Sequence, residues 1–136
     1  MTAFLAEITP DHILDLSDYE AVRKDRKSAI VAAKRDRRLA IGPDATIYFE
    51  NRETMWLQIQ EMLRIEKGGA AQLADELAAY NPMVPKGRNL SATFMIEIDD
   101  ERRRDRVLGE VGHIDQTISI KFVGEKVFAR ADDDTE

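Results

Sequence analysis

Charged residues on apolar helix faces are the first candidates for chemistry in this sequence. At about 100° per residue, Glu66 lies within the apolar arc of the segment 52–67, and Arg26 and Arg37 lie within the apolar arc of the segment 19–38. A buried charge costs several kcal/mol unless it is paired. We therefore expect an Arg26–Glu66 or an Arg37–Glu66 contact.

Two interpretations of these charges stay open. One is a structural salt bridge, or arginines whose aliphatic stems cover the core while their heads reach water. The other is a polar pocket for a small anionic ligand, to which the proline-rich loop 82–89 adds donors. The second interpretation predicts a ligand-binding set made of Arg26, Arg37, Glu66, Arg88 and Asn89, with no catalytic residue assigned.

Metal and thiol chemistry have few candidate residues. The chain has no cysteine, which excludes disulfides, a thiolate nucleophile and cysteine ligands for zinc or an iron–sulfur cluster. His12 and His113 are its two histidines, and neither has the spacing of a metal-binding motif. A carboxylate–histidine iron site is therefore the weakest interpretation. We expect no metal and no cofactor.

Basic residues gather on two helical segments. Such sets are usually solvated faces, but they can also dock an acidic protein partner. Leu57 and Ile65 lie off the core stripe of their helix and form a small apolar spot that would suit a partner or a homodimer. The two basic sets are Arg23, Lys24, Lys27, Lys34, Arg35 and Arg38 on the first segment, and Arg102, Arg103, Arg104 and Arg106 on the second.

Helices are expected to position most of these residues. A hydroxyl cap at Thr9 and a proline after it begin a short first helix, and Ser17 or Asp18 can cap the next. The clearest signal is the three- and four-residue spacing of apolar residues after Arg52. The expected helices are 12–16, 19–38, 52–67, 70–80 and 100–111.

Turn residues and alternating patterns predict the strands. Breaks at Gly42-Pro43-Asp44 and Gly124-Glu125 separate short strands and indicate hairpins over 39–49 and 117–131, and a further strand is expected over 91–98. Hairpins with helices grouped between them favour an α+β class. We expect a single domain over 1–131, with an antiparallel sheet built of hairpins and covered on one face by helices. Residues 132–136 form an acidic tail that we expect to fray.

Composition limits the partners. The chain has 136 residues and a net charge of −6, which argues against binding nucleic acid or an anionic membrane. No apolar run approaches the length of a membrane span, and the first residues lack the pattern of a signal peptide. The expected location is the cytoplasm.

Several longer motifs carry a family resemblance. They are ITPD at 8–11, KRDRR at 34–38, GPDAT at 42–46, QIQEMLRIE at 58–66, and YNP at 80–82 through GRNL at 87–90. Over essentially its whole length the chain resembles a bacterial family of uncharacterised proteins, a domain of unknown function. The resemblance implies no activity, fold or catalytic residue.

The resemblance does imply a setting. Members are often encoded beside a rubrerythrin-like protein and an iron–sulfur oxidoreductase of the heterodisulfide-reductase type, which implies a redox or peroxide-response system. Members run longer after the acidic stretch, so the C-terminus of this chain is expected to be truncated relative to the family.

Residues and resemblance together favour a cytoplasmic accessory or binding protein that docks on an iron–sulfur oxidoreductase or a rubrerythrin-like protein. The cysteine-free composition suits this role, because the electron carriers would belong to the partner. The alternative is an enzyme or sensor in which Arg26, Arg37 and Arg88 hold an anionic group and Glu66 or Glu61 acts as acid or base.

Overall fold

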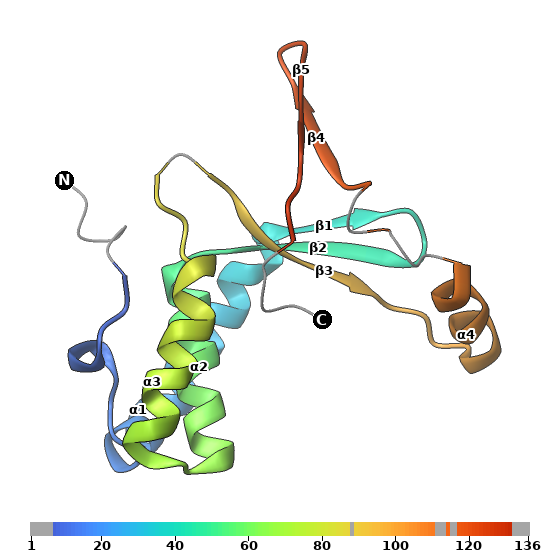
Figure 1. The fold of residues 1–136 in the computed structure, drawn as a ribbon. Helices are drawn as coiled ribbons and strands as arrows, with labels where there is room; N and C mark the ends of the chain where they lie inside the picture. The colour runs from blue at the N-terminus through green and yellow to red at the C-terminus, as the bar shows by residue number, and fades with distance from the viewer. Residues whose placement is uncertain (1–6, 88, 111–113, 115–116, 132–136) are drawn as a thin grey trace. The chain divides into compact units, whose positions relative to one another are not determined.

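The computed structural model describes residues 7–87, 89–110, 114 and 117–131 (Figure 1). It confirms the expected α+β class, with two antiparallel sheets of three and two strands. By its contacts the chain divides into two compact units, residues 1–95 and 96–136. In the part of the chain so described, no helix combines the length and the apolar character that crossing a membrane requires.

The first unit contains three helices and a three-stranded sheet in the order β1-β2-β3, and the second contains a helix and a hairpin. Short 3-10 turns lie at Pro10–His12, Arg35–Arg37 and Asn81–Met83. The helices and strands are α1 (Leu16–Lys34), β1 (Arg38–Ile41), β2 (Ala45–Glu50), α2 (Arg52–Glu66), α3 (Gly69–Tyr80), β3 (Ser91–Ile96), α4 (Glu101–Glu110), β4 (Ser119–Phe122) and β5 (Glu125–Phe128).

The helix starts follow side-chain caps. Asp15 caps α1 by accepting from the Asp18 backbone N–H at 2.8 Å, earlier than the expected cap at residue 17 or 18. Asn51 caps α2 through a reciprocal pair with Thr54. The expected helix over 12–16 is wrong: a 3-10 turn lies at Pro10–His12, residues 13–15 are not helical, and Leu16 begins α1. The residue before the 3-10 turn, Thr9, donates its N–H to His12 Nδ1 at 2.9 Å, which closes the turn after three residues.

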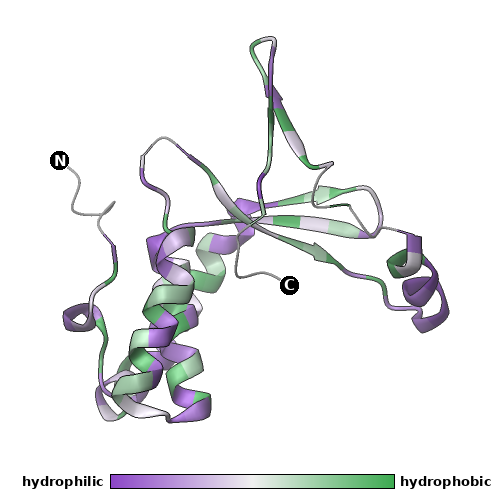
Figure 2. Cartoon of the chain, in the orientation of Figure 1, coloured by the Kyte–Doolittle hydropathy of each residue, from purple (hydrophilic) through white to green (hydrophobic). Residues whose placement is uncertain are grey.

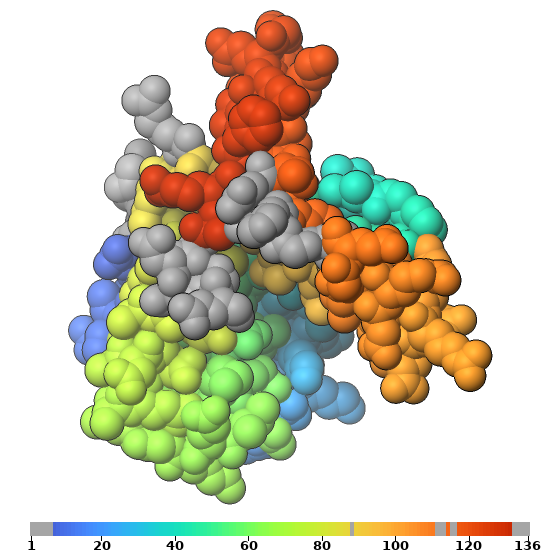
Figure 3. All heavy atoms as spheres, turned by 45° about the vertical axis from the view of Figure 1, so that its right-hand side comes forward, coloured from blue at the N-terminus to red at the C-terminus, as the bar shows by residue number. Residues whose placement is uncertain are grey.

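The main core lies among the helices of the first unit. Tyr19 on α1 and Ile59 on α2 are fully buried, and the Tyr19 ring meets the Trp56 ring edge to face with centroids 5.9 Å apart. Helices α2 and α3 lie side by side with their surfaces in contact (Figures 1 and 3). Figure 2 shows hydrophobic and hydrophilic residues mixed along these helices, as amphipathic packing requires, whereas α4 is largely hydrophilic.

Residues 7–15, which we call the strap, contact the helices and contain one 3-10 turn but no α-helix or strand. The Gln60 side chain bonds both backbone groups of Leu14, with Leu14 N to Oε1 at 2.7 Å and Nε2 to Leu14 O at 3.2 Å. Asn81 does the same for Ile8, at 2.8 and 2.9 Å. Trp56 Nε1 donates to the carbonyl of His12 at 2.9 Å. Three side chains thus satisfy the strap's backbone, as a neighbouring strand would.

The hairpin β4–β5 turns at Val123-Gly124, where both residues have positive φ, 45° and 81°. A two-residue turn of this kind matches the twist of the strands, and glycine accepts it without strain. Valine does not, because its branched Cβ is crowded at positive φ. The Val123 side chain is also 97% exposed. The hairpin therefore closes on a strained and fully exposed apolar residue.

Loss of the Gln60 amide should release the strap. We expect Gln60→Leu to lower the free energy of unfolding by about 2 kcal/mol, because it leaves the partly buried N–H and C=O of Leu14 without the side chain that bonds them. Hydrogen exchange over residues 7–15 should accelerate more than exchange over α2. Gln58→Leu is the matched control, since Gln58 is exposed and its one hydrogen bond to a described residue is to Tyr80 Oη at 3.3 Å, and it should change stability little. Equal effects of the two substitutions would contradict this role.

Candidate functional site

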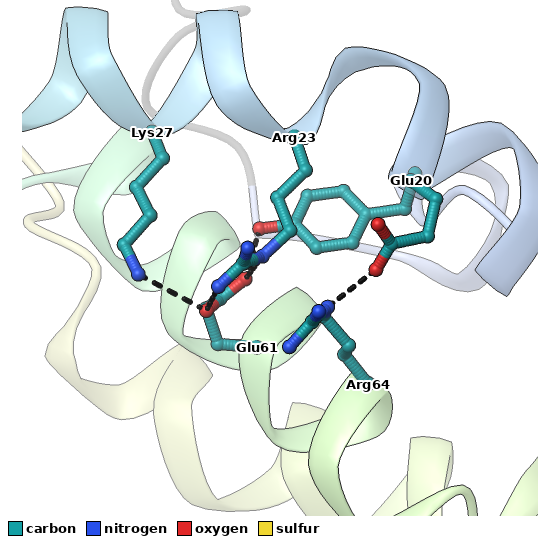
Figure 4. Close-up of polar contacts among 6 residues, drawn as sticks. Glu20, Arg23, Lys27, Glu61 and Arg64 are labelled. Atoms are coloured by element: carbon teal, nitrogen blue, oxygen red, sulfur yellow. Dashed lines mark hydrogen bonds and ion pairs between the residues drawn. The ribbon is translucent and has the colours of Figure 1, made fainter.

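The Glu61 carboxylate on α2 accepts most of the side-chain polar contacts that join α1 to α2. Glu61 accepts from Tyr19 Oη at 2.5 Å and from Arg23 through both Nε and Nη2, each at 2.9 Å. Lys27 Nζ lies 3.5 Å from Glu61 Oε1 (Figure 4). We call these four residues the Glu61 cluster. The paired Arg23 fork and the Tyr19 hydroxyl leave the carboxylate few free lone pairs.

The spacing of the donors explains the geometry. Tyr19, Arg23 and Lys27 are each four residues apart on α1, so they line one face of the helix and point toward one position on α2 (Figure 4). On the neighbouring turn Arg64 donates to Glu20 in the opposite sense, from α2 to α1. Two ion pairs of reversed polarity therefore fix how α1 lies along α2.

The environment of Glu61 decides its protonation. Its hydrogen bonds with Arg23, against the cost of burial, lower the pKa of the Glu61 carboxyl from about 4.5 to about 2. The same contact raises the pKa of Arg23, and burial together with the Glu61 carboxylate raises the pKa of the Tyr19 hydroxyl above its ordinary value. A carboxylate with so low a pKa is a weak proton acceptor near neutral pH. The cluster therefore joins helices and is poorly suited to acid–base catalysis.

Of the three arginines predicted for the pocket, the two that the structure describes have separate partners. The Arg26 guanidinium stacks over the Trp56 ring, 5.0 Å from its centroid, while the residue as a whole stays exposed. Arg37 donates from Nε to the carbonyl of Phe49 at 3.0 Å and from Nη2 to the carbonyl of Glu50 at 3.4 Å. Arg26 thus covers a core ring with its guanidinium, and Arg37 ties the turn after α1 to the end of β2.

The expectation that Glu66 points inward is wrong. Glu66 is exposed, and Gln72 donates to it at 3.1 Å, so it forms no ion pair with Arg26 or Arg37. The helical projection fails because Glu66 is the last residue of α2, where the chain turns through Lys67 at φ 53°. Gln72 from α3 also bonds the Met62 carbonyl and closes this end of the helix.

The proline-rich loop contains two of the predicted ligand-binding residues, and the structure describes one of them. Asn89 accepts from the Lys86 backbone N–H at 2.8 Å and lies 3.5 Å from Ser91 Oγ, so its side chain shapes the loop. Arg88 lies outside the described residues. Within the described part of the chain, Arg26, Arg37, Glu66 and Asn89 are each engaged locally, and their contacts do not gather them around one position.

The metal alternative gains no support. In residues 7–87, 89–110, 114 and 117–131, no group of three or more histidine, cysteine, aspartate or glutamate side chains is arranged to hold a metal ion. His12 is committed to the strap, where its ring meets the Thr9 backbone and hydroxyl. His113 lies outside these residues.

The cationic face of α1 is more distinctive. Around a shallow hollow lie four cations, a serine and two small apolar residues, and none of the described carboxylates lines it. Arg23 and Lys27 are partly neutralised by Glu61, whereas Lys24 and Arg35 form no ion pair with another described residue. We call this surface the basic hollow. It consists of Arg23, Lys24, Lys27, Ser28, Val31, Ala32 and Arg35.

Sequence reasoning missed the Glu61 cluster. It treated Arg23 and Lys27 as members of a solvated basic set and Glu61 as one alternative acid or base. The available signal was the four-residue spacing of Tyr19, Arg23 and Lys27, three donors that share one helix face. Pairing them with Glu61 required knowing that α1 packs against α2.

Fold and charges together define a small α+β protein in which the Glu61 cluster and the Arg64–Glu20 pair join two helices and a basic hollow stays exposed. The chain belongs to the family described as Protein of unknown function (DUF3501), which matches residues 7–136. Its structure is similar to a crystal structure of a novel protein of unknown function from Burkholderia pseudomallei K96243, with a TM-score of 0.85 and 34% sequence identity over 90% of this chain and 71% of that chain. The search of curated proteins found no match.

The low pKa of Glu61 gives a test by pH. A carboxyl whose pKa is lower in the folded than in the unfolded state adds stability above the unfolded pKa and loses it as the pH falls through the folded pKa. For Glu61 this window runs from about pH 4.5 down to about pH 2. We expect Glu61→Gln to cost about 2 kcal/mol at pH 7, after allowance for solvent screening, and to flatten the acid side of the stability curve. Denaturant unfolding as a function of pH measures both effects.

The matched control is Glu20→Gln. Glu20 pairs with Arg64 on the same helix interface, but its side chain is 55% exposed, so its ion pair is largely solvated. We expect a loss of less than about 0.5 kcal/mol and an acid limb like that of the wild type. If Glu20→Gln matched Glu61→Gln, the Glu61 cluster would have no special part in the interface.

Proposed function

We propose that this protein is an accessory protein that docks, through the basic hollow of α1, on an acidic surface of an iron–sulfur oxidoreductase or a rubrerythrin-like protein. The observation that carries the proposal is the hollow itself: four cations and no described carboxylate on a chain whose net charge is −6. Complementary charge of this kind steers association and selects the partner.

The form of the hollow supports a protein partner. Lys24 and Arg35 form no ion pair with another described residue. Val31, 44% exposed, offers an apolar contact between them. Protein interfaces commonly combine an apolar centre with a charged rim. Because the surface follows one helix and is shallow, it suits the broad face of a protein better than a small buried ligand.

The redox setting rests on the family resemblance. Its members are often encoded beside the two partner classes named above, and a chain without cysteine would leave the electron carriers to those partners. Cytoplasmic location belongs to the same proposal. The alternative of an anion pocket has weaker support, because its described residues are engaged in separate local contacts.

Charge reversal in the hollow tests the proposal. A rubrerythrin-like protein and an iron–sulfur subunit from a genome that encodes all three proteins are purified and titrated with this chain by calorimetry. We expect binding that weakens with added salt, and a loss of affinity of roughly tenfold or more in Lys24→Glu/Arg35→Glu. These two residues are chosen because Arg23 and Lys27 also hold Glu61, so that changing them would disturb the fold.

Arg102→Glu/Arg106→Glu is the matched control. It makes the same change in net charge on α4, where both arginines are exposed, and should leave affinity nearly unchanged at physiological salt. If neither candidate partner binds the wild type, or if the α4 variant loses as much affinity as the α1 variant, docking through the basic hollow is wrong.

A further inference from the structure

The basic hollow follows one straight stripe of α1. Four of its residues, Lys24, Ser28, Val31 and Arg35, succeed one another at spacings of four, three and four residues, and the backbone is still helical at Arg35. This alternation keeps side chains on one side of a helix, and it is the spacing at which two helices pack lengthwise. At about 1.5 Å of rise per residue, Lys24 and Arg35 lie about 16 Å apart along the axis. We call these four residues the stripe.

The middle of the stripe is small and apolar, and its ends are charged. Ser28 and the adjacent Ala32 have short side chains, and Val31 is 44% exposed. Small residues at a crossing let two helix axes approach to about 8 Å. Lys24 and Arg35 are both exposed at the two ends. A partner that fits this surface needs an apolar centre between two negative charges.

The other two cations of the hollow serve the fold as well as the surface. Figure 4 shows Arg23 and Lys27 reaching from α1 toward Glu61 on α2, which accepts from both. Their charges are thus partly neutralised, whereas Lys24 and Arg35 form no ion pair with another described residue. The strongest attraction for an acidic partner therefore lies at the two ends of the stripe.

We infer that the partner presents an acidic amphipathic helix, which packs lengthwise on the stripe. Its carboxylates are about eleven residues apart and meet Lys24 and Arg35, and an apolar side chain midway between them contacts Val31. The inference rests on the docking through the basic hollow proposed above, and it names the structural element that docks.

A helix suits this surface better than an extended segment does. The peptide groups along the stripe bond one another within α1, so α1 presents no open strand edge. An extended segment pressed onto Val31 would shield its own peptide groups from water without giving them new partners, which costs free energy. A helix bonds its peptide groups internally and can therefore bury an apolar side chain against Val31 without that cost.

Nucleic acid fits the stripe less well than an acidic helix. Its phosphates repeat every few ångströms along the strand. The cations without a described ion pair, Lys24 and Arg35, are instead about 16 Å apart with an apolar residue between them. The net charge of −6 also opposes a polyanion that extends beyond the stripe.

Two synthetic peptides of identical composition test the inference. Both are stapled helices of about 18 residues, because short free peptides are marginally helical in water. The first has two glutamates about eleven residues apart and a leucine midway on one face, and the second has the same residues on different faces. Fluorescence anisotropy should show the first binding the wild-type chain at least tenfold more tightly than the second. Lys24→Glu/Arg35→Glu should remove that difference.

Ser28→Tyr tests close packing from the side of this chain. A ring in the middle of the stripe holds a second helix away, so the affinity for the first peptide should fall roughly tenfold. Ala29→Tyr is the matched control, because Ala29 is also exposed but points about 100° further round the helix. It should leave the affinity nearly unchanged, and circular dichroism checks that both variants keep their helices.

Equal affinity for the two peptides, or binding of neither, would overturn the inference. So would tighter binding of a proline-interrupted version of the first peptide, or of an oligothymidylate with the same charge. These outcomes are distinct from a failure of the docking proposal. A partner protein that binds the wild type and loses affinity in Lys24→Glu/Arg35→Glu supports docking through the basic hollow even if neither peptide binds.

Discussion

The carboxylate of Glu61 decides how the helices of the first unit lie together. It takes a bidentate bond from Arg23 and a hydroxyl from Tyr19, which is also fully buried and packs against Trp56. A partly buried charge with directional partners tolerates little sliding, whereas apolar contacts alone would permit several registers. Together with the Arg64–Glu20 pair, the Glu61 carboxylate sets the orientation of α1, and with it the position of the basic hollow.

The sequence predicts the elements well and their contacts poorly. Apolar spacing and glycine breaks predict α2 and α3 to within about a residue, because both are local signals. The end of α1 is less well predicted. Residues 35–37 continue the helical pattern, yet the chain leaves the α-helix after Lys34 and Arg37 bonds to β2. That ending depends on a strand which the pattern cannot place in space.

The predicted site shows the same limit. Arg26 and Arg37 are predicted to point inward, whereas Arg26 is exposed with its guanidinium over the Trp56 ring and Arg37 is partly buried and bonds a backbone carbonyl. Their partners were not predictable, because a carbonyl group and an indole ring are uncharged and the pattern of charges in the sequence does not indicate them. The helical projection placed Glu66 wrongly, because the last residue of a helix need not follow the apolar face of the residues before it. Local rules identify groups that need a partner, but the tertiary packing chooses it.

The strap has an implication for how the sequence can change. Gln60 and Asn81 bond the peptide groups of Leu14 and Ile8, which every residue type except proline provides in the same form. These bonds are the same whatever side chains the attached segment carries, while Ile8 in the core and Ile13 and Leu14 packed against it hold the segment through their side chains as well. Positions in the strap that face solvent are free to drift among relatives while the segment stays in place, and the selective constraint falls on two amides far along the chain.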